Sequence, residues 1–210
     1  MTGRRRERLD AAVAEIGDAA TGVQGDVANL ADLDRLFARI ERERGRVDVV
    51  FANAAISESY AIDAIDEGRF DRVFGANVKG MVFTVQKALP LLVPGGAVIL
   101  AGSGSGRKGF AGLTVYNATK AAIRSLARTW TTELQSRGIR VNVVSPGVID
   151  TPAQTFLQNT PEMENVLEQM TPLGRIGSPD EVAKTVLLAS SESSFVAGVE
   201  LFVDGGIMAV

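Results

Sequence analysis

The chain has 210 residues, of which 46% are hydrophobic and 22% are charged, and its net charge is −3. This composition is typical of globular proteins, and we interpret residues 1–210 as a single domain. The acidic balance argues against nucleic-acid partners, and no apolar run approaches the roughly 20 residues of a membrane span. Since no apolar stretch follows the first arginines either, we expect no signal peptide and predict a cytoplasmic protein.

The chain contains neither cysteine nor histidine. The lack of cysteine excludes disulfides, thiolate nucleophiles and iron–sulfur clusters. The lack of histidine excludes a Ser-His-Asp hydrolase and most zinc sites, and we expect no metal site. Acid–base chemistry near neutral pH must therefore use Tyr, Lys, Asp or Glu with a shifted pKa, and the chain has only two tyrosines.

In the first half of the chain, helical and strand patterns alternate. Apolar residues at helical spacing predict a helix over residues 9–16, and a short, weak strand follows over 20–25. A clean amphipathic pattern predicts the next helix over 29–44, before a compact apolar strand over 47–51. A long helical region is predicted over 67–92.

The alternation continues after Pro94-Gly95-Gly96, which we expect to break that helix. The further predicted elements are a buried strand over 97–100, a helix over 114–137, a buried strand over 141–144, a helix from the capping box at Ser178 to about residue 190, and a strand over 200–203. This order indicates an α/β fold with a Rossmann-like, doubly wound parallel sheet. Sites in such folds lie at the carboxyl ends of the strands.

Tyr116 and Lys120 form the strongest candidate for chemistry. They are four residues apart in the predicted helix, so they lie on one face about one turn apart. An ammonium beside a phenol favours the phenolate and lowers the tyrosine pKa from about 10 toward neutrality. Such a tyrosine could protonate a forming alkoxide or deprotonate an alcohol. A partly exposed tyrosine beside a solvated lysine is the alternative interpretation.

Ser103 strengthens this candidate. It lies thirteen residues before Tyr116, in a glycine-rich segment directly after a predicted buried strand. A hydroxyl there could donate to a substrate carbonyl and hold it against the tyrosine, although a flexible turn would have the same composition. Buried strand, serine, tyrosine and lysine at these spacings form a much more specific pattern than any part of it.

This pattern resembles the short-chain dehydrogenase/reductase family, and the similarity covers essentially the whole chain. Further segments resemble motifs of the family in the same order: Asp26-Val27, Ala52-Asn53-Ala54-Ala55, Asn77-Val78-Lys79-Gly80, Ser145-Pro146-Gly147-Val148-Ile149-Asp150-Thr151, Pro172-Leu173-Gly174-Arg175 and Val203-Asp204-Gly205-Gly206. Each segment alone is a weak signal, but all of them in the family's order form a strong one.

The resemblance implies an oxidoreductase that transfers a hydride between NADP(H) or NAD(H) and a carbonyl or secondary alcohol. Tyr116 would exchange the proton, and Lys120 would lower its pKa and bind the nicotinamide ribose. Ser103 would orient the substrate oxygen, and Asn77 would hold a water in the proton relay. The residues that would contact the cofactor are Arg4, Asp26, Val27, Asn53, Ala54, Tyr116, Lys120, Pro146, Gly147, Val148 and Thr151.

Arg4 bears on the choice of cofactor. In family members that use NADP(H), an arginine after the second strand pairs with the 2′-phosphate, and Thr2-Gly3-Arg4 resembles that segment. We therefore expect NADP(H) to be preferred, with NAD(H) as the other option. A solvated basic start of a helix is the alternative interpretation of Arg4.

One motif of the family has no counterpart here. Members open with a strand and a turn of the type Thr-Gly-x-x-x-Gly-x-Gly, which holds the pyrophosphate, and no segment of this chain matches it. We therefore expect a fold that is incomplete at the N-terminus, with residue 1 near the end of the family's second strand. An impaired member that serves as an oligomeric scaffold or relic is the competing hypothesis.

The resemblance also leads to two structural expectations and one about specificity. Without the first strand, residues 20–25 should either pair directly with 47–51 or lose strand structure. The helix over 114–137 should help to form a homodimer or homotetramer. Substrate specificity should lie in residues 152–171, where Phe156, Leu157, Met163 and Met170 suggest an apolar lid.

Overall fold

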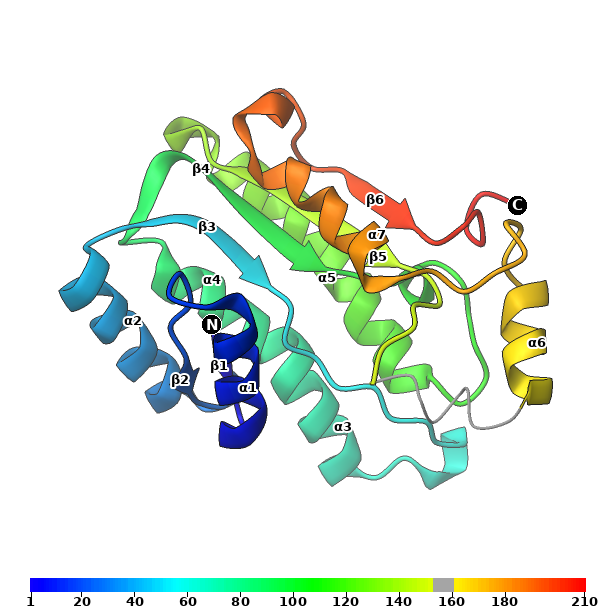
Figure 1. Cartoon of the computed structure of the whole chain (residues 1–210). Coiled ribbons are helices and arrows are strands. Elements are labelled where there is room, and N and C mark those ends of the chain that lie inside the picture. Colours follow the sequence, from blue (N-terminus) through cyan, green and yellow to red (C-terminus); the bar gives the residue numbers. More distant parts are fainter. Residues whose placement is uncertain (153–160) are drawn as a thin grey trace.

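The computed structural model describes residues 1–152 and 161–210. Helices and strands alternate along them, as the sequence predicts (Figure 1). The elements are β1 (Thr2–Gly3), α1 (Arg6–Ile16), β2 (Val23–Gln24), α2 (Leu30–Arg44), β3 (Val47–Ala52), α3 (Glu67–Phe74), α4 (Gly80–Ala88), β4 (Leu92–Ala101), α5 (Thr114–Glu133), β5 (Arg140–Pro146), α6 (Pro161–Gln169), α7 (Pro179–Ala183) and β6 (Glu200–Val203).

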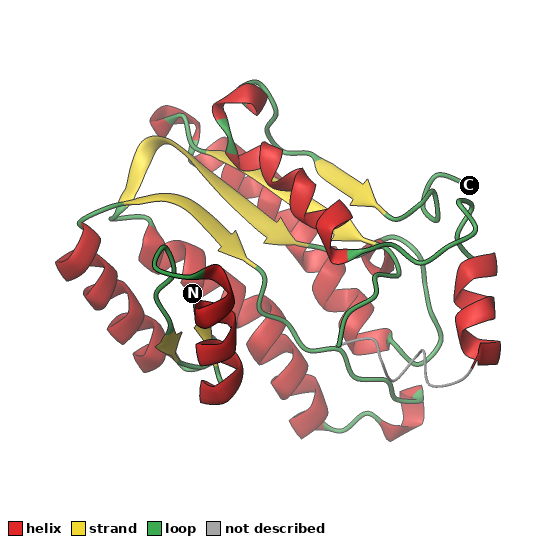
Figure 2. Ribbon diagram, viewed as in Figure 1, coloured by secondary structure: helices red, strands yellow, loops and turns green. Residues whose placement is uncertain are grey.

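The main sheet is parallel throughout, and its four strands lie in the order β3-β4-β5-β6. The two-residue strands β1 and β2 form a separate parallel pair. The predicted Rossmann-like α/β fold is therefore confirmed. Because all four strands run in one direction, the segments that follow β3, β4 and β5 emerge at the same edge of the sheet (Figure 2).

Alternating residues of the strands pack on the two faces of this sheet. Val50, Val98 and Val141 belong to the larger core, which they share with helices α2, α4 and α5. On the opposite face, a smaller core around Ile99 and Val144 packs against α7 and the 3₁₀ turn Lys184–Ala189. That second layer does not cover β3, where Val49 and Phe51 are 42% and 58% exposed.

The expectation for residues 20–25 is wrong in both of its forms. Val23–Gln24 keep a short strand, but they pair with Thr2–Gly3 rather than with β3. Helix α1 connects β1 to β2, and the Thr2 hydroxyl donates to the carbonyl of Val23 at 2.7 Å. Since the start of the chain offers a parallel partner after one crossover helix, the backbone groups of residues 23–24 need no pairing with β3.

The predicted helix over 67–92 is also longer than the observed one. The observed helical region consists of α3, a π-helical turn over Gly75–Lys79, and α4, which ends at Ala88. Strand β4 begins at Leu92, which pairs with Val47, and the register shifts between that pair and Val49–Ala97. The Pro-Gly-Gly segment is therefore a bulge inside a strand and not the end of a helix.

Other predicted elements agree closely with the structure. Helix α5 begins at Thr114 as expected, and the capping box at Ser178 opens α7, which continues as a 3₁₀ turn to Ala189. In the proposed lid, Phe156 and Leu157 lie outside the described residues, as does the side chain of Met163, whereas Met170 is exposed. None of the described helices is long and apolar enough to cross a membrane.

The segment after β3 is fixed to α3 by a polar cluster. Glu58 accepts hydrogen bonds from Arg72 at 2.8 and 2.9 Å and from the Tyr60 hydroxyl at 2.5 Å. These bonds, led by those from Arg72, lower the pKa of Glu58 from 4.5 to about 2. The carboxylate therefore stabilises the folded state fully above about pH 4.5, and this contribution is lost as the pH falls toward 2.

We expect Glu58→Gln to lower the free energy of unfolding at pH 7 by about 0.5–1 kcal/mol, since solvent screens a partly exposed ion pair. The difference from the parent chain should shrink as the pH falls below 4.5, because Glu58 of the unfolded parent then binds a proton that the folded parent binds only near pH 2. Urea unfolding at pH 7 and pH 3 measures both values. An equal difference at the two pH values would contradict the assignment to the charge of Glu58.

Candidate active site

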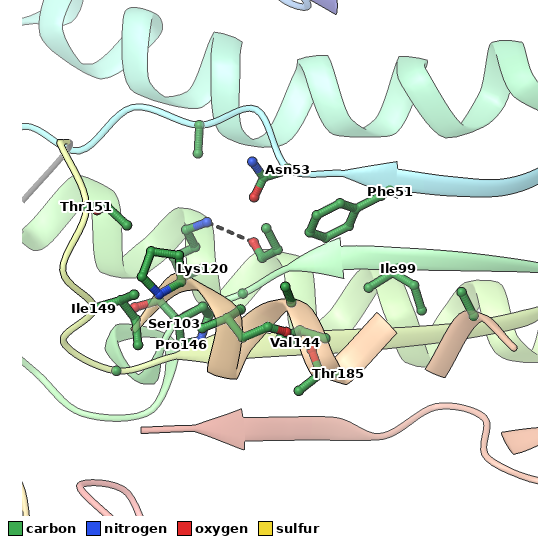
Figure 3. A pocket seen from close by; sticks show the side chains of 18 of the residues that line it. Phe51, Asn53, Ile99, Ser103, Lys120, Val144, Pro146, Ile149, Thr151 and Thr185 are labelled. Atoms are coloured by element: carbon green, nitrogen blue, oxygen red, sulfur yellow. Dashed lines mark hydrogen bonds between the residues drawn. The ribbon is translucent and has the colours of Figure 1, made fainter. Parts of the chain in front are cut away.

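A cavity of about 560 Å³ lies where β3, β4 and β5 end (Figure 3). Of the residues expected to carry the chemistry, Ser103, Tyr116 and Lys120 all line it. The other expected residues among its lining are Asn53, Pro146, Gly147 and Thr151. Three segments that are far apart in the sequence therefore meet at the carboxyl edge of the sheet, as the parallel topology requires.

Ser103 and Tyr116 come from neighbouring elements. Ser103 is the second residue after β4, and its hydroxyl oxygen accepts a hydrogen bond from the amide of Ser105 at 3.2 Å. This bond caps the 3₁₀ turn Gly104–Gly106 that follows. Tyr116 lies in the first turn of α5, and its side chain is hydrogen-bonded to that of Ser103.

Lys120 is one turn further along α5 and is only 2% exposed. Its Nζ donates to the carbonyl of Ala101 at 2.8 Å, the bond drawn in Figure 3, and lies 5.5 Å from the centroid of the Tyr116 ring. Burial lowers the pKa of Lys120 from 10.5 to about 8. The amine therefore still carries its charge at neutral pH but loses it in mildly alkaline solution.

The expectation that the pKa of Tyr116 is lowered toward neutrality is wrong. Burial raises the pKa of Tyr116 above its ordinary value, and the hydrogen bond with Ser103 opposes this shift only in part. The spacing places an ammonium near the phenol, but the Lys120 amine is directed at the carbonyl of Ala101. Desolvation of the phenolate therefore dominates, and Tyr116 is a phenol at neutral pH.

Asn77 lies in the π-helical turn between α3 and α4 and is fully buried. Its amide oxygen accepts from the backbone N–H of Ile56 at 2.8 Å. Its amide nitrogen donates to the carbonyl of Ile56 at 2.9 Å and to the Thr119 hydroxyl at 3.1 Å. Asn77 thus connects the segment after β3 to the residue beside Lys120, and its role toward a relay water stays a prediction.

The segment after β5 forms one wall of the cavity. A methyl group on Gly147 would lie 2.7 Å from the Cα of Asp204, so only glycine lets this wall approach the end of β6. Among the described residues, Ile149 lines the cavity and Val148 does not. In an extended segment, successive side chains point to opposite sides. Which of the two neighbours, Val148 or Ile149, faces the cavity therefore depends on how the backbone is oriented.

The remaining expected cofactor contacts surround a second cavity of about 240 Å³, whose lining includes Arg4, Asp26, Val27 and Ala54. Arg4 and Asp26 form an exposed ion pair at 4.0 Å. Ala55 lines both cavities, so the two adjoin at the end of β3. Several apolar residues that line the larger cavity could not be identified from the sequence, because apolar residues on strands and helices are equally typical of a core. These residues are Val49, Phe51, Ile99, Val144, Val182 and Ala183.

Comparison with known proteins identifies the family of this chain. A family model described as enoyl-(acyl carrier protein) reductase matches residues 1–208. An oxidoreductase of Sarocladium schorii is 47% identical over 208 residues, which cover 98% of this chain and 83% of that protein.

Two solved structures have the same fold. A 3-ketoacyl-(acyl-carrier-protein) reductase of Brucella melitensis, solved with NADH, is 28% identical with a TM-score of 0.91, over 99% of this chain and 86% of that one. A gluconate 5-dehydrogenase of Burkholderia cenocepacia, solved with NADP and tartrate, is also 28% identical with a TM-score of 0.91, over 100% of this chain and 85% of that one. From the family match and the 47% identity, we conclude that this chain belongs to the short-chain dehydrogenase/reductase family and is an NAD(P)-dependent oxidoreductase.

Proposed function

We propose that this chain interconverts a carbonyl and a secondary alcohol with NADP(H) as the preferred cofactor, and that Tyr116 exchanges the proton. The observation that carries the proposal is the meeting of Ser103, Tyr116 and Lys120 in one cavity. A hydroxyl donor, a half-buried phenol and a buried amine are groups suited to acid catalysis on a carbonyl when histidine is absent. Reduction of carbonyl compounds by NADPH is the direct test.

The residues present fit the two ends of a dinucleotide. The two adjoining cavities offer hydroxyl and amine donors at one end, and an arginine beside a carboxylate at the other. Because Gly147 lacks a side chain, the segment after β5 lies close to Asp204, and this segment forms a wall of the cavity against which a ring could pack. The nicotinamide end would be held by Asn53, Tyr116, Lys120, Pro146, Gly147 and Thr151, and the adenosine end by Arg4, Asp26, Val27 and Ala54. The bound cofactor supplies the hydride.

The chain's own residues would then handle the substrate oxygen and its proton. The Ser103 hydroxyl donates to the carbonyl oxygen and holds it against Tyr116. Because burial raises its pKa, Tyr116 holds its proton at neutral pH and donates it as the alkoxide forms. The Lys120 ammonium stabilises the resulting phenolate, which is the state of Tyr116 that needs a nearby charge.

The scaffold hypothesis is not favoured, because all three groups of the proposed mechanism converge in one cavity. Substrate identity stays open within the class of carbonyl compounds and secondary alcohols. The named neighbours act on substrates as different as a ketoacyl thioester and gluconate.

The preference for NADP(H) rests on Arg4. We expect Arg4→Ala to weaken NADPH binding by about tenfold, because one charge-assisted hydrogen bond to a phosphate contributes about 1.5 kcal/mol. NADH has no 2′-phosphate, so its affinity should change less than twofold. Titration of the fluorescence of each reduced cofactor measures both affinities. Arg6→Ala is a matched control, since Arg6 is exposed and pairs with Asp10 on α1. Equal losses for NADPH and NADH would contradict the preference.

We also propose a homodimer or homotetramer, formed across α5 and the helix before it. Ala118 and Ala121 on α5 are exposed, and such small side chains allow two helices to approach closely. Light scattering at micromolar concentration should give a mass at least twice that of one chain. A monomeric mass would contradict this part of the proposal.

A further inference from the structure

Glu200 is a buried carboxylate that the mechanism above does not use. It is the first residue of β6, and its side chain is only 6% exposed. It accepts a hydrogen bond from the Ser145 hydroxyl at 2.8 Å and one from Nε of Arg107 at 3.1 Å. Nε of Arg124 lies 2.6 Å from the same carboxylate, although this N–H is not aligned for a hydrogen bond. One carboxylate therefore balances two guanidinium groups.

Each partner of Glu200 belongs to a different segment of the active site. Arg107 directly follows the 3₁₀ turn that begins after Ser103. Arg124 lies on α5 one turn after Lys120, and it also donates to the carbonyl of Gly106 at 3.2 Å. Ser145 directly precedes the Pro146-Gly147 wall of the cavity. The loop with the substrate-orienting hydroxyl, the catalytic helix and the cofactor wall thus converge on Glu200.

The packing around this cluster is tight. A methyl group on Gly102 would lie 2.2 Å from the Ser145 hydroxyl oxygen and 2.5 Å from a methyl group of Val143. The start of the Ser103 loop therefore rests directly on the residue that Glu200 holds. On the outer side, the Arg107 guanidinium lies 4.9 Å from the centroid of the Phe202 ring, which holds it beside the carboxylate. These contacts restrain the loop from both of its ends.

We infer that Glu200 is a positioning residue, which fixes the loop of residues 102–107 against α5 through Arg107, Arg124 and Ser145, and thereby sets the place of the Ser103 hydroxyl relative to Tyr116. Without the carboxylate, two guanidiniums would face each other with their charges uncompensated. Arg107 would then turn to solvent, and the bond from Arg124 to the loop would lose its orientation. The consequence for catalysis rests on the proposed function; the consequence for the loop does not.

Hydrogen exchange tests the loop directly. The amides of Gly106, Arg107 and Lys108 are bonded within the loop to carbonyls of Ser103 and Gly104. In Glu200→Gln, which keeps the shape but removes the charge, we expect these amides to exchange at least about tenfold faster, because local opening costs less. The control is Glu43→Gln, since Glu43 also pairs with two arginines but lies on α2. Unchanged exchange in Glu200→Gln would overturn the inference, whether or not the chain turns over a substrate.

Kinetics then test the link to Ser103. Glu200→Gln should lower kcat for carbonyl reduction by about 10–100-fold with the KM for NADPH within about twofold, because misplacement of one donor is costly. In a Ser103→Ala background the same change should cost less than about twofold, since the two residues act through one group. A general structural defect would instead multiply with the loss from Ser103→Ala, and that result would overturn the link.

The two failures can be told apart. If the parent reduces no carbonyl, or if Ser103→Ala retains full activity, the proposed function fails, while the exchange measurement still decides the position of the loop. If Glu200→Gln does not fold, Arg107→Gln takes its place, because Arg107 is nearly half exposed. Arg107→Gln should also speed the exchange of the loop amides and lower kcat, but by only about three- to tenfold. Unchanged loop exchange together with unchanged kcat in that variant would overturn the inference.

Discussion

Replacing Tyr116 by Phe is expected to lower kcat for carbonyl reduction by about 10²–10⁴-fold, the contribution of one well-placed general acid. The substitution removes the hydroxyl and its hydrogen bond with Ser103 but keeps the ring that α5 packs into the cavity wall. NADPH affinity and the urea midpoint should therefore stay close to those of the parent. Steady-state kinetics with NADPH and a panel of ketones and 3-oxoacyl thioesters provide the measurement.

The chain offers a matched control for this variant. Tyr60 is the other tyrosine, and its hydroxyl donates to Glu58 beside α3. Tyr60→Phe should leave kcat within about twofold, because that hydroxyl stabilises a segment and transfers no proton. Turnover of Tyr116→Phe within tenfold of the parent would remove Tyr116 from the mechanism.

Replacing Lys120 by Met should have a comparably large effect but a different kinetic signature. Methionine fills a similar volume and removes both the charge and the donor to the carbonyl of Ala101. We expect kcat/KM for reduction to fall by about 10²–10⁴-fold, because the phenolate of Tyr116 loses its stabilising charge. NADPH binding should also weaken, unlike in Tyr116→Phe, since Lys120 is proposed to contact the ribose.

A pH profile adds a second test of Lys120. Its pKa of about 8 means that the amine is charged below that pH and neutral above it. In the parent, kcat/KM for reduction should therefore decline above about pH 8, whereas the residual activity of Lys120→Met should lack this decline. Lys87→Met is the control, because Lys87 pairs with Asp34 away from the cavity. An identical alkaline decline in parent and Lys120→Met would assign it to another group.

The meeting of Ser103, Tyr116 and Lys120 in one cavity could be predicted from the sequence because it depends on two short-range rules. Helical spacing places Tyr116 and Lys120 on one face, and a buried parallel strand delivers Ser103 to the edge of the sheet where α5 begins. The direction in which the pKa of Tyr116 shifts could not be predicted in the same way. It depends on how strongly the surrounding chain desolvates the phenol and on where the Lys120 amine points, and neither is encoded in the spacing.

The other features that could not be predicted from the sequence depend on pairing between distant segments. Leu92 continues the helical pattern of the preceding residues, but its pairing with Val47 makes it part of β4. Val23–Gln24 pair with Thr2–Gly3, a partner too short to be recognised as a strand by periodicity. Glu200 would be interpreted as a surface residue of an edge strand, and its proximity to Ser145 follows only from the register of β6 on β5.

The transfer of deuterium from NADPH that carries deuterium in place of both hydrogens on the reactive nicotinamide carbon tests the central claim most directly. With any ketone that the chain reduces, mass spectrometry of the alcohol should locate the deuterium on the former carbonyl carbon. The rate should fall by at least about 10²-fold in Tyr116→Phe, as expected for loss of the general acid, but not in Tyr60→Phe. Alcohol without deuterium at that carbon would contradict hydride transfer from the cofactor, and equal rates in the parent and Tyr116→Phe would contradict the proposed role of Tyr116.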